Sequence, residues 1–207
     1  MSPRPYRLGQ RQAAIEQTRG RIIEATRELL MENDGFSRFS IDLVARRADV
    51  ARMTVYHQFG SRVGLLEALC DTLAANGKME SLGGAFQLAD PFEALKRYIA
   101  VFGHFYDTDR LVTRRLRAVA TLDSEFGQII SERDSWRQKG LTVLIQRVHE
   151  QRPFPSAEAV AETIAVMLTL TSFESFDTLA GPERSLEEVA PLIQRLALAT
   201  LDMAYKS

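Results

Sequence analysis

The chain has 207 residues, 45% of them hydrophobic and 26% charged, with a formal net charge of −1 at pH 7. This length is sufficient to bury the core of one or two domains. The single cysteine excludes an intrachain disulfide, and no run of about 18 uncharged apolar residues is present that could span a bilayer. The first residues include arginines but no apolar segment typical of a secretory signal, so we expect a cytoplasmic protein without a membrane partner.

Apolar residues recur with helical periodicity along nearly the whole chain, and no segment alternates as a strand would, so the sequence predicts an all-α protein. Residues 1–14 are expected to form a flexible basic arm, containing Pro3, Arg4, Pro5, Arg7 and Arg11. A first helix is predicted at about residues 11–32. It should end at residues 33–35, Asn-Asp-Gly, where glycine favours the left-handed conformation of a helix C-terminus.

Two short helices joined by a three-residue turn are predicted next. Ser40 is a suitable N-cap for the first, and the second covers about residues 51–59. Such a pair is the helix-turn-helix unit, whose second helix enters the major groove of DNA. A further helix, capped by Ser61, carries an apolar face of leucines. The residues expected to pack between the two short helices are Val44, Ala45, Val55 and Phe59.

Residues 77–89 contain three glycines and no sustained periodicity, which predicts a connection between two domains. The first domain would cover residues 15–76 and the second, an all-helical domain, residues 90–207. Asp90 and Ser185 are suitable N-caps, and Pro191 is expected to kink the last helix or delay its start. The helices predicted in the second domain cover about residues 91–106, 109–121, 124–151, 156–179 and 185–204.

Positive charge is concentrated in the N-terminal part of the chain. Residues 1–62 contain 11 arginines, no lysine and 7 acidic residues, whereas the rest contains 15 basic and 20 acidic residues. Such a local surplus attracts phosphate-bearing partners, although a merely solvated basic face is an equal alternative. Guanidinium, hydroxyl, amide and imidazole groups suit base edges and phosphates. On the second short helix the outward or sideways set is Arg52, Met53, Thr54, Tyr56, His57 and Gln58.

Several short motifs follow one another at specific spacing between Gly35 and Leu69. They are Gly35-Phe36, Ser40, Val44-Ala45, Thr54-Val55-Tyr56-His57-Gln58-Phe59 and Ser61-Arg62. This run resembles the DNA-binding signature of the TetR family of transcriptional repressors almost position by position. Four residues depart from the family pattern: Asp49 replaces the turn glycine, Ala51 a Ser/Thr cap, Met53 a small residue and Arg62 a lysine. Aspartate tolerates the left-handed conformation, so the turn is expected to survive.

The resemblance implies a repressor that binds double-stranded DNA at a palindromic operator as a homodimer and responds to a small-molecule effector. It implies that Tyr56 and Arg62 bind phosphates and that Ser40 offers its hydroxyl and neighbouring backbone amides to another phosphate. Residues Arg52, Met53, Thr54 and Gln58 would then lie nearest the base edges, with His57 on the same face. The basic arm could add minor-groove contacts. No cofactor, metal ligand or catalytic residue is implied.

Effector binding and dimerisation are expected in the second domain. In TetR-like proteins two central helices of this domain line the effector cavity, which would hold a small apolar or aromatic molecule. For each aromatic side chain there, simple core packing is the alternative. The last two helices are expected to form the dimer interface, through small residues at 157–172 and the stripe Leu192, Leu196, Ala199 and Met203. The candidate effector-binding residues are Phe102, His104, Phe105, Arg133, Trp136 and Phe173.

Two other classes of protein remain as alternatives. An all-helical enzyme would need a catalytic motif, but no histidine follows a glutamate at the di-iron spacing, and no zinc-protease, nucleophile-elbow or phosphate-binding glycine motif occurs. The lone Cys70 lies among leucines and is expected to be packed. An interaction module could instead use the helix-turn-helix only as a fold, with a protein partner. The sequence therefore favours a DNA-binding regulator and not an enzyme.

Overall fold

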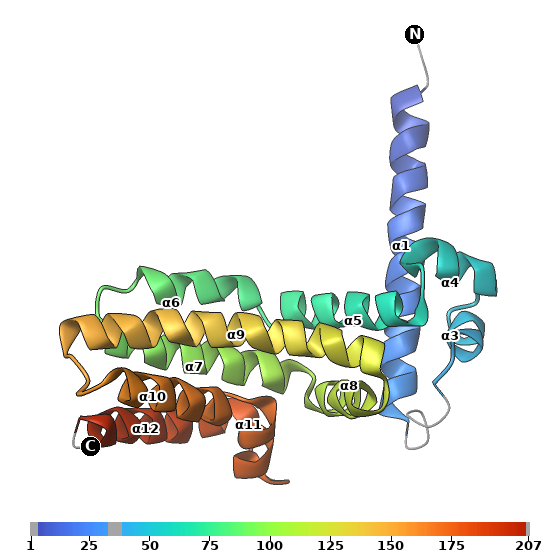
Figure 1. Ribbon diagram of the computed structural model, residues 1–207. Coiled ribbons are helices and arrows are strands. Elements are labelled where there is room, and N and C mark those ends of the chain that lie inside the picture. The colour runs from blue at the N-terminus through green and yellow to red at the C-terminus, as the bar shows by residue number, and fades with distance from the viewer. Residues whose placement is uncertain (1–3, 33–38, 206–207) are drawn as a thin grey trace. The chain divides into compact units, whose positions relative to one another are not determined.

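The computed structural model describes residues 4–32 and 39–205, and the regular elements in these ranges are all helices, which confirms the all-α prediction (Figure 1). The predicted stop of the first helix at residues 33–35 and the Gly35-Phe36 pair lie outside the described residues. The elements are α1 (Arg4–Met31), α3 (Ile41–Arg47), α4 (Arg52–Phe59), α5 (Arg62–Asn76), the 3₁₀ helix η1 (Met79–Leu82), α6 (Gly83–Gln87), α7 (Pro91–Thr108), α8 (Arg110–Leu122), α9 (Ser124–Gln151), α10 (Ala157–Leu170), α11 (Phe173–Ala180) and α12 (Leu186–Ala204).

The chain forms two compact units. Unit 1 comprises residues 1–72 and 111–129, and unit 2 comprises residues 73–110 and 130–207. The glycine-rich stretch at 77–89, predicted as a loose connection, instead contains η1 and α6 and belongs to unit 2. Its Ala85 is buried in the unit 2 core, and both short helices pack on α7. Met79, Leu82 and Phe86 also pack against this core. Burial of these apolar side chains explains why the stretch forms regular helices despite its glycines.

Unit 1 is built around a helix-turn-helix in which α3 packs on both α1 and α4. The predicted inner residues Val44, Ala45 and Val55 are at most 4% exposed. The Ser40 hydroxyl accepts a hydrogen bond from the Leu43 backbone N–H at 3.3 Å and so caps α3. Ser61 caps the start of α5 in the same way, with the Gly64 N–H at 3.0 Å. These local bonds confirm the boundaries that the sequence predicted.

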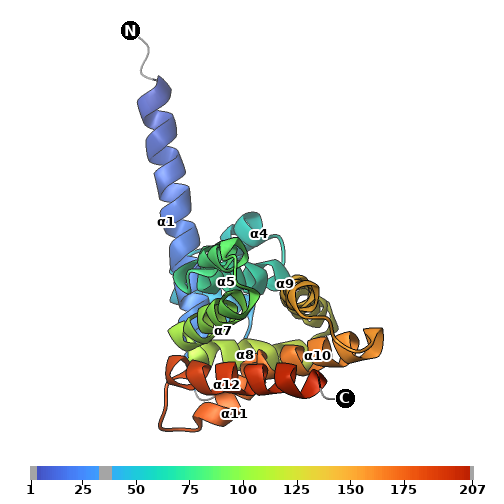
Figure 2. The same cartoon turned by 90° about the vertical axis from the view of Figure 1, so that its left-hand side faces the viewer.

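Unit 2 has a core formed mainly by α7, α9, α10, α11 and α12. Helices α10 and α12 lie side by side, and α12 also packs along α7 (Figure 2). Asp90 caps α7, because its carboxylate accepts a hydrogen bond from the Phe92 N–H at 2.8 Å. Ser185 and Glu188 form the predicted capping box, and α12 starts at Leu186, so the proline inside this helix does not delay its start.

Two predicted boundaries differ from the structure. Helix α1 begins at Arg4, so the segment predicted as a flexible arm is helical from that residue. The single helix predicted at residues 156–179 is two helices, α10 and α11, bent by 55°. Ser172 separates them, because its hydroxyl accepts the Ser175 N–H at 3.2 Å and begins a new helix. By length and apolar content, no single helix within the described ranges could cross a membrane, although the bent α10–α11 pair taken together meets the same criterion.

Candidate nucleic-acid interface

Helix α4 presents a mixed polar face around its buried Val55. Its N-cap residue, Ala51, makes no side-chain cap bond, so the first backbone N–H groups of α4 are not satisfied by a side chain at this position. Met53 is 59% exposed, so most of its side chain is not packed against a neighbouring helix. Of the remaining predicted residues on this face, Arg52 and His57 are exposed, and Thr54, Tyr56 and Gln58 are half-buried.

The turn before α4 has the backbone conformation that the helix-turn-helix requires. Asp49 has a φ of 52°, in the left-handed region that glycine adopts without strain and aspartate tolerates better than most residues. The Val50 N–H donates to the Ala45 carbonyl at 3.0 Å, which closes the end of α3. The replacement of glycine by Asp49 therefore leaves the turn intact, as expected.

Arg52 is held at the start of α4 by two neighbouring side chains. Its Nη1 lies 3.2 Å from the Asp42 carboxylate, and its Nη2 donates to the Tyr56 hydroxyl at 3.3 Å. The hydrogen bond to Tyr56 and the charge of Asp42 raise the pKa of Arg52. Asp42 was not identified from the sequence, because an acidic residue in the first turn of a helix is common and gives no sign of a partner ten residues away.

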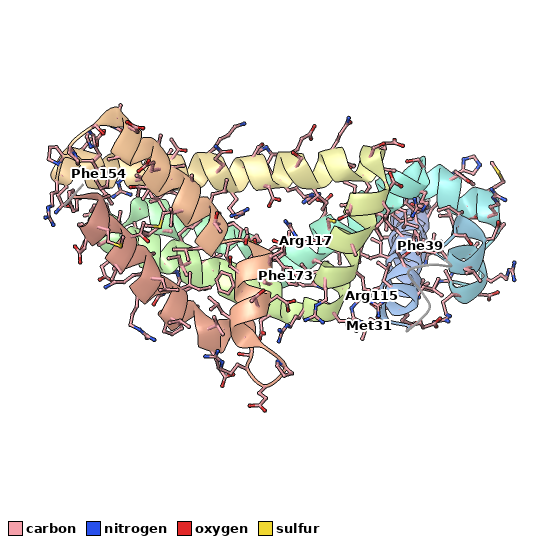
Figure 3. All side chains as sticks on the ribbon, turned by 60° about the horizontal axis from the view of Figure 1, so that its bottom comes forward. Met31, Phe39, Arg115, Arg117, Phe154 and Phe173 are labelled. Carbon is pink, nitrogen blue, oxygen red and sulfur yellow. The ribbon has the colours of Figure 1, made fainter. Side chains whose placement is uncertain are left out.

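Arg62, the predicted phosphate ligand, also has an internal partner. Its Nη1 lies 2.5 Å from the Asp123 carboxylate in the turn between α8 and α9, and its guanidinium lies 5.3 Å from the ring centroid of Phe39, which Figure 3 labels. A hydrogen bond from the Phe126 N–H, and then the charge of Arg62, lower the pKa of the Asp123 carboxyl. No sequence signal links these residues, because 61 positions separate Arg62 from Asp123.

An arginine of α1 contacts the C-terminal end of α4. Arg19 donates to the Gln58 carbonyl at 3.1 Å, and its guanidinium lies 4.4 Å from the ring centroid of Phe59. This contact covers the half-buried Phe59 and fixes the C-terminal end of α4 on α1. Charged side chains from two other helices, Arg19 of α1 and Asp42 of α3, thus contact residues of α4.

Comparison with known proteins agrees with this geometry. Residues 22–69 match the family model described as "Bacterial regulatory proteins, tetR family". This segment is similar to the DNA-binding domain of that family. The matched residues contain α3, α4 and most of α5, so the TetR motif falls on the elements that position Arg52, Tyr56 and Arg62. The matched segment is about a quarter of the chain and is the part that contains the helix-turn-helix.

Solved structures show the same fold over most of the chain. The TetR regulator PfmR from Thermus thermophilus is 24% identical, with a TM-score of 0.65 over 86% of this chain and 97% of PfmR. A TetR regulator from Haloarcula marismortui is 16% identical, with a TM-score of 0.68 over 91% and 98%. The fatty acid degradation regulator FadR from Bacillus halodurans is 17% identical, with a TM-score of 0.66 over 87% and 94%. Comparison with curated proteins finds no match.

In unit 2, the structure brings together three of the six predicted effector-binding residues. Phe102 and Phe105 of α7 and Phe173 of α11 each contact the ring of Tyr106, at centroid distances of 5.6, 5.1 and 5.5 Å. Figure 3 labels Phe173. Phe102 and Phe173 are buried, whereas Phe105 is half-buried. Phe176 also packs on Tyr106, with ring centroids 5.6 Å apart. These rings form one aromatic cluster in the core of unit 2.

The other three predicted residues, His104, Arg133 and Trp136, are not members of this aromatic cluster. Trp136 is 62% exposed on α9, and His104 pairs with the Glu187 carboxylate at the surface. Trp136 and His104 were expected to face the core. Each lies one or two positions along its helix from a residue that does, and on a helix such neighbours point in different directions. Arg133 is half-buried. Gly103 and Gly140 leave no open space beside these rings, because an added Cβ would lie 3.1 Å from the Phe176 ring at Gly103 and 2.9 Å from the Tyr98 oxygen at Gly140.

Proposed function

We propose that the protein is a repressor that binds a palindromic operator as a homodimer and releases it when a small apolar or aromatic effector binds. The observation that carries this proposal is the polar face of α4 within a TetR-family domain. Tyr56 and Arg62 would contact phosphates together with Ser40, while Arg52, Thr54 and Gln58 would approach base edges. The exposed Met53 is suited to contact a thymine methyl group.

Exposed apolar residues on α10 and α12 support dimerisation, which this function requires. One helix-turn-helix contacts few base pairs, so two are generally placed about 34 Å apart on the two halves of a palindrome. Val166 of α10 and Leu196 and Met203 of α12 are 43%, 38% and 68% exposed, so each leaves apolar surface for a partner to bury. The small side chains Ala161 and Ala199 are also exposed and permit close approach of helices.

The aromatic cluster of unit 2 supports an apolar effector. Aromatic walls favour flat or chain-like apolar ligands. Phe102, Phe105 and Phe173 are the proposed contacts, with Arg133 as the residue that would orient a polar group. Because the structurally similar FadR is a fatty acid regulator, fatty acids belong in the first ligand panel alongside flat aromatic compounds.

The proposal is tested by selecting DNA from a random duplex library with the purified full-length protein. We expect recovery of a palindromic sequence whose half-sites are about 10 base pairs apart, centre to centre. Arg52→Ala and Gln58→Ala should relax the recovered sequence, while Tyr56→Phe should weaken binding to all duplexes. Failure of the wild-type protein to enrich any sequence would refute the proposal.

The effector proposal needs its own measurement, in which each compound of the panel is added to the complex with the selected duplex. A compound that releases the wild-type protein should act at a higher concentration on Phe105→Ala. Trp136→Phe is the matched control, because Trp136 is exposed and its replacement should leave the response unchanged. An unchanged response in Phe105→Ala would exclude the aromatic cluster as the binding site.

A further inference from the structure

Two of the three arginines on α3 and α4 are paired with acidic side chains of unit 1. Arg47 of α3 forms ion pairs with Glu28 of α1 and with Glu32, which directly follows α1, and Arg52 of α4 forms one with Asp42 of α3. Binding to DNA without regard to sequence is driven mainly by the attraction of free cationic side chains to phosphates. Internal pairing of these arginines therefore lowers the part of the affinity that carries no sequence information.

The Asp42–Arg52 pair has the geometry to do more than neutralise charge. Both Asp42 carboxylate oxygens lie 3.2 Å from Arg52 Nη1, and Arg52 Nη2 donates to the Tyr56 hydroxyl at 3.3 Å. The guanidinium carbon also lies 5.6 Å from the centroid of the Tyr56 ring. Two groups on different sides thus restrict the guanidinium, which is a flexible group on most protein surfaces. The pair remains accessible, because the side chains of Arg52 and Asp42 are 57% and 47% exposed.

We propose that Asp42 is a specificity-determining residue, which orients Arg52 toward a base edge and prevents it from acting as a general phosphate ligand. This inference rests on the proposed DNA-binding function and adds to it a residue of α3, outside the recognition helix. A phosphate must compete with the Asp42 carboxylate for the Arg52 charge, and it is also repelled by that carboxylate.

A base edge does not face the same competition. Arginine has five N–H donors in a fixed fork, and the contacts with Asp42 and Tyr56 use only part of them. A guanine presents two neutral acceptors, O6 and N7, to which a pre-oriented guanidinium can donate while the carboxylate keeps its own hydrogen bond. Asp42 therefore decreases the affinity for an arbitrary duplex more than it decreases the affinity for the operator.

The test compares wild-type protein with Asp42→Asn on two probes: the duplex enriched from a random library by the wild-type protein, and a scrambled duplex of the same composition. Asp42→Asn should bind the scrambled duplex several-fold more tightly, with a salt dependence steeper by about one phosphate contact. The ratio of the two affinities should fall by about fivefold to tenfold, because a bidentate base contact provides discrimination of at least this size. A library selection with the variant should recover a sequence with one degenerate position in each half-site.

Asp49→Asn is the matched control, because it removes one negative charge from the same helix-turn-helix. Asp49 is exposed and forms no ion pair within the described ranges, and asparagine also tolerates its φ of 52°. This variant should strengthen binding to both duplexes equally and leave their ratio unchanged. Asp42→Glu, which keeps the charge, should retain most of the wild-type discrimination.

Three outcomes of these measurements would overturn the inference about Asp42. An equal gain for both duplexes in Asp42→Asn would show that Asp42 acts only through general charge and would overturn the inference. A lowered melting temperature with an unchanged affinity ratio would reduce Asp42 to a structural link at the start of α3, which also overturns it. If the wild-type protein enriches no sequence, the proposed function fails first, and the inference fails with it.

Discussion

Tyr98 illustrates how strongly a single side chain is constrained in unit 2. It is fully buried, and its hydroxyl donates to the Arg137 carbonyl at 2.8 Å. Burial raises the pKa of the Tyr98 hydroxyl, so the group stays protonated and remains a donor at any ordinary pH. Its ring also lies against Gly140 of α9, where an ideal Cβ would come within 2.9 Å of the Tyr98 oxygen. The glycine is therefore required by this close approach.

We predict that Gly140→Ala destabilises the protein although alanine is the better helix former. The gain in helix propensity is about 1 kcal/mol, whereas overpacking a filled core costs about 1–3 kcal/mol. Gly20→Ala is the control, since a Cβ at Gly20 of α1 would meet no atom within 4 Å. Urea unfolding should show a lower midpoint for Gly140→Ala and an equal or higher one for Gly20→Ala. If both substitutions stabilised the protein, the Tyr98 side chain would have moved to make room for the added methyl group, and the prediction would be wrong.

The Arg62–Asp123 pair predicts competition between an internal carboxylate and DNA. If Arg62 binds a phosphate, Asp123→Asn should strengthen binding to all duplexes and steepen the salt dependence by about 0.9 in log–log slope. Arg62→Ala should weaken binding, and Asp123→Asn should have no further effect in that background. Glu125→Gln, an exposed neighbour in the first turn of α9, serves as the charge control. Additive effects in the double variant would contradict the competition.

The same pair predicts how stability depends on pH. Hydrogen bonding from the Phe126 N–H and the charge of Arg62 lower the pKa of Asp123 in the folded protein. Its contribution is therefore fully present above the unfolded pKa of about 3.9 and is lost as the pH falls through the lower folded value. The difference in unfolding free energy between wild type and Asp123→Asn should stay constant from about pH 8 to pH 5 and shrink only below about pH 4. A difference that disappears between pH 7 and pH 5 would contradict this assignment.

At the scale of elements, the break between α10 and α11 depends on a residue from another helix. Arg137 of α9 is 6% exposed and donates from Nη1 to the Leu168 carbonyl at 2.6 Å and to the Thr171 hydroxyl at 2.9 Å. These acceptors lie at the C-terminal end of α10, where helix carbonyls lack internal partners. A charged donor at this point satisfies them and allows the chain to turn into α11.

We predict that Arg137→Leu destabilises unit 2 by about 3 kcal/mol, because hydrogen bonds from a charged donor contribute about 1.5–3 kcal/mol each and two acceptors lose theirs. The neighbouring exposed Gln138→Ala should change stability by less than about 0.5 kcal/mol. Thermal and urea unfolding of both variants provide the measurement. Equal stability of Arg137→Leu and wild type would show that the end of α10 is satisfied in another way.

The difference between local and distant contacts explains which elements could be predicted from the sequence. Ser40, Ser61, Asp90 and Ser185 act on backbone groups two or three positions away, so their caps could be identified from spacing alone. The α10–α11 break was missed, because it depends on Arg137 and on a serine pattern inside a continuous apolar stretch. The partners of Arg52 and Arg62 were missed for the same reason. Apolar periodicity alone also could not separate Trp136, which is exposed, from the buried face of α9.

At the scale of the whole molecule, part of the positive charge in residues 1–62 is paired with internal carboxylates. Arg27, Arg47, Arg52 and Arg62 all form ion pairs with carboxylates in unit 1. The proposed operator binding would then depend on shape, on base contacts and on the simultaneous use of two domains. A monomer that relied on one such domain would bind weakly, which makes the oligomeric state decisive for function.

We predict that the protein is a dimer and that the exposed apolar residues of α10 and α12 form its interface. Light scattering at micromolar concentration should give twice the chain mass of 23.3 kDa. Leu196→Glu and Met203→Glu would place charges on this surface, and burial of an unpaired charge is strongly unfavourable, so both variants should be monomeric. Val143→Glu on α9 is the control, because Val143 is 50% exposed outside the proposed interface.

The monomeric variants should also lose affinity for the selected palindrome by at least about a hundredfold, while a single half-site duplex should be bound as weakly as by the wild type. This second measurement separates loss of dimerisation from loss of folding, because a misfolded variant would lose the half-site as well. A wild-type mass of one chain, or a Met203→Glu dimer with unchanged affinity, would contradict the proposed interface. In that case the exposed apolar residues of α10 and α12 would need a different partner, and the palindrome would have to be bound by two independent molecules.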